Sequence, residues 1–295
     1  MDLRSSISRV LKADQEYHRE SVARRYAWTF GVKMLYKYKS LSGEGRDQVL
    51  DMIQNSRFYC SAPNELNDHA DCQPVFALAK SLEDPAFLKE LIEDQRLLAT
   101  ERGISEKELQ RILGQEGMPA AELAANVQAE VRAGLEKSTR LFCLSADGAS
   151  RRLWPHYANG HRGVALHFRV TSANIFGAAR KIEYSPVRQP VLIPLEYTGD
   201  YDEVVKRLAL CKADDWAAEN EYRILLYDGD PPMGGPGGRF VPFDAPELTG
   251  ITLGLQISQA DRAMVQGWVE NRTPRVGVFQ AVEAADFGIE LRQIG

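Results

Sequence analysis

The sequence predicts an α+β fold whose core is a split, mostly antiparallel β-sheet. Strand-like segments dominate after residue 139, and short helix-like runs separate them without the regular alternation of a βαβ protein. A helical, amphipathic region at about 80–139 interrupts this pattern. With 295 residues, of which 44% are hydrophobic and 26% charged, the chain is long enough to bury a substantial core.

The beginning of the chain, residues 1–30, is predicted to form an N-terminal helical arm. Apolar residues recur there at roughly helical spacing, with arginine and lysine side chains between them. Such an arm could bind nucleic acid or an acidic partner, but the interpretation that we favour packs it on the body or on a second copy of the chain. The remainder, 31–295, is predicted to be one α+β domain that contains the helical insertion.

The elements of that domain follow from periodicity and from glycine and proline punctuation. A strand at 33–41, an amphipathic helix at 44–55 and a strand at 57–63 precede a polar loop at 64–74. The insertion contains three predicted helices, 81–98, 105–116 and 119–138, which we interpret as a lid or a partner surface. Later helices are expected near 151–158, 199–211 and 258–271. The later strands are 140–145, 163–168, 179–185, 222–227, 239–243, 251–255, 275–280 and 289–293.

Composition limits the classes of function. A net charge of −5 disfavours a dedicated nucleic-acid binder. The four cysteines form no C-x-x-C pair, which indicates reduced thiols and a cytoplasmic protein. The N-terminal segment lacks the apolar centre of a secretory signal, and no run is long enough to cross a membrane. We therefore expect no membrane partner.

The stretch 211–228 carries the most informative polar pattern. In a strand, residues two apart face the same way, so Glu219, Glu221 and Arg223 are predicted to share one face. Two carboxylates beside a guanidinium indicate either a solvated charge ladder or the rim of a site. The sequence leaves both open.

Other kinds of site have weaker support. There is no G-x-S-x-G elbow for a hydrolase, and no P-loop or dinucleotide-binding glycine pattern. Asp68, His69, Asp71 and Cys72 cluster in one loop, but without the spacing of a known metal motif. We expect no metal.

Several short pieces resemble a bacterial family that is catalogued only as a domain of unknown function, numbered twenty-nine seventy-one. Its recurring pieces look like Y-K-Y-[KR]-S, F-x-x-P-x-x-x-N-D-x-x-D, F-C-L-S, W-x-x-Y-A-x-x-H-x-G-x-x-x-x-F and W-x-x-E-x-E-x-R. In this chain they stand at 36–40, 59–71, 142–145, 154–168 and 216–223. The family name implies no activity.

The order of three of these pieces is also similar to that of ADP-ribosyltransferases. Those enzymes carry a basic residue on a first strand, a serine motif on a second strand, and a glutamate pair near the start of a later strand. The matching residues here are Lys37 or Lys39, then Ser145, then Glu219 and Glu221. The match is loose, because Lys stands where many of these enzymes use Arg or His, and S-T-S appears as L-S-A.

This second resemblance implies a split-sheet core like that of the transferases, and NAD as a substrate. The lysine would hold the pyrophosphate or ribose, and Ser145 would orient the nicotinamide ribose. Glu221 would hydrogen-bond the ribose 2′-OH and stabilise the positive charge that develops as nicotinamide leaves. Glu219 would position the acceptor. The other residues implied in NAD binding are Tyr36, Tyr38, Trp154, Tyr157 and Arg223.

The implied reaction is transfer of ADP-ribose to a macromolecular acceptor, protein or nucleic acid, as in a toxin or a phage-defence effector. An inhibitor or partner protein would fit that setting. One alternative is a metal-dependent nuclease that uses Asp68, Asp71, Glu219 and Glu221. Another is a non-catalytic binding or adaptor module, in which the tyrosines and tryptophans are core residues and the charges are a surface ladder.

Overall fold

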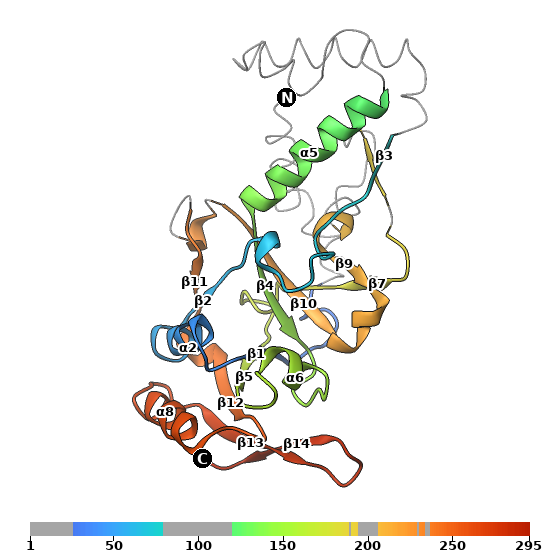
Figure 1. Ribbon diagram of the computed structural model, residues 1–295. Coiled ribbons are helices and arrows are strands. Elements are labelled where there is room, and N and C mark those ends of the chain that lie inside the picture. The colour runs from blue at the N-terminus through green and yellow to red at the C-terminus, as the bar shows by residue number, and fades with distance from the viewer. Residues whose placement is uncertain (1–25, 79–119, 189, 194–205, 229, 234–236) are drawn as a thin grey trace. The chain divides into compact units, whose positions relative to one another are not determined.

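A computed structural model describes residues 26–78, 120–188, 190–193, 206–228, 230–233 and 237–295 (Figure 1). It has the predicted α+β class, with helices and a mostly antiparallel multi-stranded sheet. The chain divides into two compact units. The first takes its described residues from 62–139 and 185–213, and the second takes them from 23–61, 140–184 and 214–295. The described part of the predicted insertion, 120–139, falls in the first unit.

The first unit contains the helix α5 (Ala120–Ser138) and the short elements η3 (Pro63–Glu65), β3 (Phe76–Leu78), β8 (Val191–Ile193) and β9 (Cys211–Ala213). α5 confirms the predicted helix at 119–138. β3 pairs with β8 in parallel, with Phe76 opposite Val191. The predicted helices 81–98 and 105–116, and residues 1–25 of the predicted arm, lie outside the described residues.

The second unit is built on an eight-stranded sheet with the order β14-β13-β12-β5-β1-β4-β10-β6. The longer strands form close to where the sequence predicts them, and the central ones are buried almost continuously because both faces of the sheet are covered there. Their bounds are β1 Met34–Lys39, β4 Thr139–Ser145, β5 Val164–Arg169, β6 Arg180–Lys181, β10 Glu221–Tyr227, β12 Leu248–Leu253, β13 Gly277–Glu283 and β14 Ile289–Gln293. β7 (Glu183–Ser185) follows β6 in the chain.

β1 lies near the middle of this sheet and joins segments that are distant in sequence. It pairs antiparallel with β5 along its whole length, from Met34 opposite Arg169 to Lys39 opposite Val164. It pairs antiparallel with β4, with Tyr36 opposite Ser145. β12 and β13 are parallel, and the helix α8 (Gln259–Glu270) connects them. Its N-cap Ser258 accepts a hydrogen bond from the Asp261 N–H, as a capped helix start requires.

The predicted helix at 44–55 is present but changes its winding. It begins as α2 (Glu44–Leu50) and continues as the π-helical turn η2 (Asp51–Asn55). Ser56, with φ of 48°, ends it. Arg272 donates hydrogen bonds to the carbonyls of Ile53 and Ala245, which anchors this turn to a distant loop.

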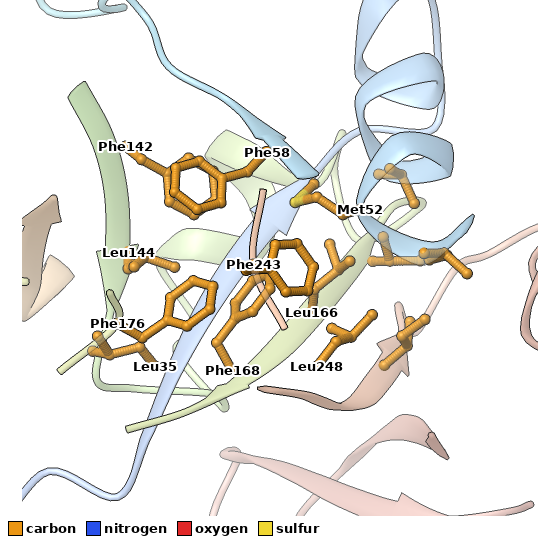
Figure 2. Packing of buried hydrophobic residues seen from close by; sticks show 14 of the residues in the cluster. Leu35, Met52, Phe58, Phe142, Leu144, Leu166, Phe168, Phe176, Phe243 and Leu248 are labelled. Atoms are coloured by element: carbon orange, nitrogen blue, oxygen red, sulfur yellow. The ribbon is translucent and has the colours of Figure 1, made fainter. Parts of the chain in front are cut away.

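The main core covers one face of the sheet and is rich in phenylalanine (Figure 2). β2 (Arg57–Tyr59) pairs with β11 (Phe240–Pro242) and places Phe58 in this core. The Phe58 ring stacks on Phe142 with 4.2 Å between the centroids. Val49, Met52 and Ile53 from the helical segment at 44–55, and Val265 and Val269 from α8, pack against the same cluster.

A smaller cluster covers the other face. The short helix α6 (Leu153–Tyr157) supplies Leu153 and Trp154, and these pack with Tyr38 and Ala165 of the sheet. Each central strand therefore has one face against the main core and the other against the smaller cluster. The face on which a side chain lies decides which other candidate residues it can contact. Among the helices in the described ranges, none is both long enough and apolar enough to traverse a bilayer.

Candidate functional site

The side chains of β1 divide between the two faces of the sheet. Leu35 belongs to the main core, so Lys37 and Lys39, two and four residues on, point to that face. Tyr38 belongs to the smaller cluster, and Tyr36 packs beside it. We call the face that carries Tyr36 and Tyr38 the tyrosine face.

Two neighbouring strands add polar residues to the tyrosine face. Ser145 on β4 is directly opposite Tyr36, and opposed residues of antiparallel strands share a face. On β10, Tyr222 and Ile224 belong to the main core. Glu221 and Arg223 alternate with them along the strand and therefore face the other way. The structure therefore brings Tyr36, Tyr38, Ser145, Glu221 and Arg223 to one face of three adjacent strands.

Ser145 connects the end of β4 to the segment before β10. Its hydroxyl donates to the Glu219 carbonyl at 2.6 Å and accepts from the Asp147 N–H at 2.9 Å. The side chain is 4% exposed. The serine therefore fixes the backbone that carries Glu219.

Glu219 is close to Ser145, but it is not part of the strand. It ends the 3₁₀ helix η6 (Asp214–Glu219), and Asn220, with φ of 44°, separates it from β10. The prediction that Glu219 shares a strand face with Glu221 by alternation is therefore wrong in its reasoning, because the chain turns between them. The carboxylate Oε1 of Glu219 accepts a hydrogen bond from the Tyr157 hydroxyl at 2.6 Å. Glu219 is 7% exposed, whereas Tyr157, at the end of α6, is only half-buried.

Glu221 forms a buried two-point ion pair with Arg223. Arg223 Nε lies 2.6 Å from Glu221 Oε1, and its Nη2 lies 3.2 Å from Oε2. The guanidinium is fully buried and Glu221 is 4% exposed. The Glu221 N–H also donates to the Tyr184 hydroxyl at 2.9 Å. The solvated charge ladder left open by the sequence is thus excluded, because this pair is inside the protein.

The aromatic residues beside these carboxylates are held by their own contacts. The Tyr38 hydroxyl donates to the Asp147 carbonyl at 2.8 Å and accepts from the Ser150 N–H at 3.2 Å. Burial raises the pKa of Tyr38 well above its ordinary value. Trp154 packs edge-on to Tyr38 at 5.1 Å and is fully buried. In this structure Trp154 is a core residue without an exposed ring face on which a nucleotide could stack.

Lys37 and Lys39 lie on the main-core face of β1, opposite the tyrosine face. Lys37 Nζ donates to the Cys143 carbonyl at 2.8 Å and lies 4.8 Å from the centroid of the Phe142 ring, on the main-core face. Burial lowers the pKa of Lys37, and burial together with the charge on Lys37 lowers the pKa of Lys39 to about 8. Glu221 and Glu219 act against this lowering of the Lys37 pKa, so the expectation that a lysine lies with Ser145 and Glu221 in one site stays a prediction. Alternation nevertheless turns both lysines away from the face that carries Ser145 and Glu221. Tyr36 and Tyr38 are the β1 residues on that face.

No family model, curated protein or solved structure matches this chain. The two resemblances drawn from short pieces of sequence therefore stay predictions. What can be said of function comes from the geometry described above.

The loop residues Asp68 and Asp71, which the nuclease alternative would use, make other contacts. Asp71 forms an ion pair with Lys212 in the first unit, at 3.6 Å, and both side chains are 3% exposed. The Asp68 carboxylate accepts from the Ala70 N–H at 2.9 Å. Within the described ranges, histidine, cysteine, aspartate and glutamate do not gather in a group of three or more suited to a metal ion. A small pocket in the same unit, with a cavity volume of about 20 Å³, is lined by residues that include Cys72 and Arg207, and by none of the predicted site residues.

Sequence reasoning missed a buried histidine on the tyrosine face. His167 on β5 packs edge-on to Tyr36 at 4.9 Å and stacks on Phe279 at 5.1 Å. Its Nε2 and the Thr252 hydroxyl form a 2.7 Å hydrogen bond, and burial lowers the pKa of the imidazole to about 4. The signal was its position two residues before the end of a strand, between buried apolar neighbours, but its partners come from strands more than eighty residues away.

Proposed function

We propose that this protein cleaves NAD at the bond between nicotinamide and ribose and transfers ADP-ribose to a macromolecular acceptor. The observation that carries the proposal is the meeting of Ser145, Glu219 and Glu221 where β4 ends and β10 begins. This is the set of side chains, in the order along the chain, that the resemblance to ADP-ribosyltransferases implies. Tyr36 on the adjacent strand completes the group.

The chemistry needs a fixed negative charge next to a carbon that becomes positive. As the glycosidic bond breaks, its electron pair leaves with the nicotinamide nitrogen, and the ribose C1′ gains oxocarbenium character. A positioned carboxylate stabilises that charge more in the transition state than in the ground state. The acceptor nucleophile then forms the new bond to C1′ and releases its proton.

Each residue has a role that its contacts support. Arg223 orients the Glu221 carboxylate through two hydrogen bonds, and because Glu221 is 4% exposed, the residues that cover this pair would have to open before the ribose could reach it. Ser145 holds the Glu219 backbone, and Tyr157 holds the Glu219 carboxylate. Because Tyr157 is the half-buried partner of a buried carboxylate, its displacement is the step that would uncover Glu219 for the acceptor.

We further propose a cytoplasmic setting, with a cellular protein or nucleic acid as acceptor. All four cysteines lie in the described ranges and none forms a disulfide, as expected in a reducing compartment. A toxin or a defence effector that is restrained by an inhibitor protein would fit this activity.

The test measures nicotinamide release and label transfer from NAD labelled in its adenylate. Wild type, Glu221→Gln and Glu283→Gln are each incubated with a mixture of cell protein and nucleic acid. Glu283 is an exposed glutamate on β13 and serves as a matched control for the same substitution. We expect Glu221→Gln to lose at least a hundredfold in both readouts, and Glu283→Gln to keep wild-type rates.

Thermal melting separates a catalytic from a structural loss, because Glu221→Gln also removes a buried charge partner of Arg223. If Glu221→Gln melts below the assay temperature, Tyr157→Phe replaces it, since that change removes one hydroxyl from a half-buried ring. Equal release by wild type and Glu221→Gln, or no release by wild type, would refute the proposal. Nucleic-acid degradation that needs Mg²⁺ or Mn²⁺ but not NAD would establish the nuclease instead.

A further inference from the structure

β14 is an edge strand of the eight-stranded sheet. It pairs antiparallel with β13, from Phe279 opposite Gln293 to Glu283 opposite Ile289. In the part of the chain that the structure describes, β13 is its only neighbour in the sheet. An edge strand offers a row of backbone groups on which another strand can pair.

The hydrogen bonds at both ends of the β13–β14 ladder show which backbone groups point outward. Ala284 N–H donates to the Gly288 carbonyl at 3.0 Å, and Ile294 N–H donates to the Val278 carbonyl at 2.8 Å. In an antiparallel pair the bonded positions alternate, so even-numbered residues from 288 to 294 direct their backbone groups toward β13. Ile289, Leu291 and Gln293 therefore direct theirs to the outer side.

The exposed side chains of β14 are arranged in a self-complementary way. Glu290 and Arg292 are 55% and 66% exposed and lie on one face, with Arg292 Nη2 3.2 Å from Glu290 Oε2. If a second, identical strand runs antiparallel with Leu291 opposite Leu291, then Glu290 of each copy lies opposite Arg292 of the other. In that register Leu291 is a hydrogen-bonded pair, and the two Glu–Arg pairs are non-bonded pairs, whose side chains approach more closely.

The exposed apolar residues near β14 fit the same register. Ile294 is 47% exposed, and it would lie opposite Gly288 of the second copy, which has no side chain to obstruct it. Phe287, in the hairpin before β14, is 81% exposed and lies beside that glycine. We propose that β14 pairs with β14 of a second copy of this chain across a two-fold axis at Leu291.

The interface is expected to be weak. A five-residue strand pair buries less than the roughly 1,200–2,000 Å² of a stable interface. Dimerisation should therefore depend on concentration. It should also weaken with salt, because the two Glu–Arg pairs are exposed.

Sedimentation velocity over a concentration series tests the pairing with charge reversals. Glu290→Arg turns both cross-strand Glu–Arg pairs into pairs of arginines. Arg292→Glu turns both into pairs of glutamates. We expect each single variant to dimerise at least tenfold more weakly than wild type. The double variant Glu290→Arg/Arg292→Glu restores opposite charges at both positions and should dimerise as wild type does.

Mixing gives a second and independent result. An equimolar mixture of the two single variants presents only arginines on one copy and only glutamates on the other, so we expect a heterodimer from two chains that are monomers alone. Glu270→Arg, a reversal at an exposed position of α8, is the control and should leave the dimer unchanged.

Three outcomes would overturn the pairing. They are a wild-type chain that stays monomeric throughout the series, a dimer that both single variants keep, and a mixture that forms no heterodimer. If β14 instead captured a strand of a different protein, wild type would be monomeric alone and the proposal would fail.

Discussion

Phe58 is a core residue whose loss should strongly destabilise the second unit. It is fully buried, stacks on Phe142 at 4.2 Å, and has Phe176 and Phe243 within 6.3 Å. Removing a buried phenylalanine side chain costs about 3–5 kcal/mol, and the aromatic contacts place Phe58→Ala in the upper half of that range. We expect a loss of about 4 kcal/mol in the free energy of unfolding.

Phe240→Ala is a matched control on the partner strand of the same two-stranded sheet. Phe240 is opposite Tyr59, its side chain is 36% exposed, and Arg57 lies 4.4 Å from its ring centroid. An edge-to-face contact and an exposed cation–π contact are together worth about 1 kcal/mol. The same substitution should therefore cost about a quarter as much here.

Urea unfolding followed by circular dichroism measures the difference. With a slope of about 2 kcal/mol per molar urea, Phe58→Ala should lower the midpoint by about 2 M and Phe240→Ala by about 0.5 M. Equal midpoints for the two variants would refute the reasoning, because they would mean that burial and stacking at Phe58 contribute nothing beyond an exposed ring.

Three further predictions concern buried charged and ionisable groups. Burial lowers the pKa of Lys39 from 10.5 to about 8, so above pH 8 the unfolded chain holds more protons than the folded chain. The free energy of unfolding should therefore rise from pH 8 to 9.5, and Lys39→Met should flatten that rise in the urea midpoints. His167, with its pKa lowered from 6.5 to about 4, should show no titration of its imidazole protons by NMR between pH 8 and 5. The protein should lose stability as pH falls from about 6.5 to about 4, because the unfolded chain then holds more protons. Arg272→Met should cost about 2–3 kcal/mol in urea unfolding, because the carbonyls of Ile53 and Ala245 lose a buried charged donor; an unchanged midpoint would contradict this role.

The longer elements could be predicted from sequence because each carries its own pattern. β10 alternates buried apolar side chains with polar ones, and α8 begins at a serine cap. The strands that sequence reasoning missed, β3, β8 and β9, are three residues long. A three-residue strand has too few positions to show a period, and it exists because a partner strand lies beside it.

Part of the candidate site could also be predicted. Glu221 and Arg223 share a face because a strand alternates, and this holds in the structure. The face on which the β1 lysines lie could not be predicted relative to Ser145. Alternation separates Lys37 from Tyr36, but only the register of β1 against β4 decides which of them lies beside Ser145. That register is set by packing on both faces, and no local pattern contains it.

The central position of β1 has a consequence for how the chain is made. Tyr38 and Asp147, which are joined by a hydrogen bond, are 109 positions apart. At roughly 5–20 residues per second, the ribosome needs about 5–20 s to synthesise that interval, and during this time β1 has neither of its sheet neighbours. A nascent chain that is halted before β4 would therefore carry an incomplete second unit, in which β1 cannot yet pair on either side.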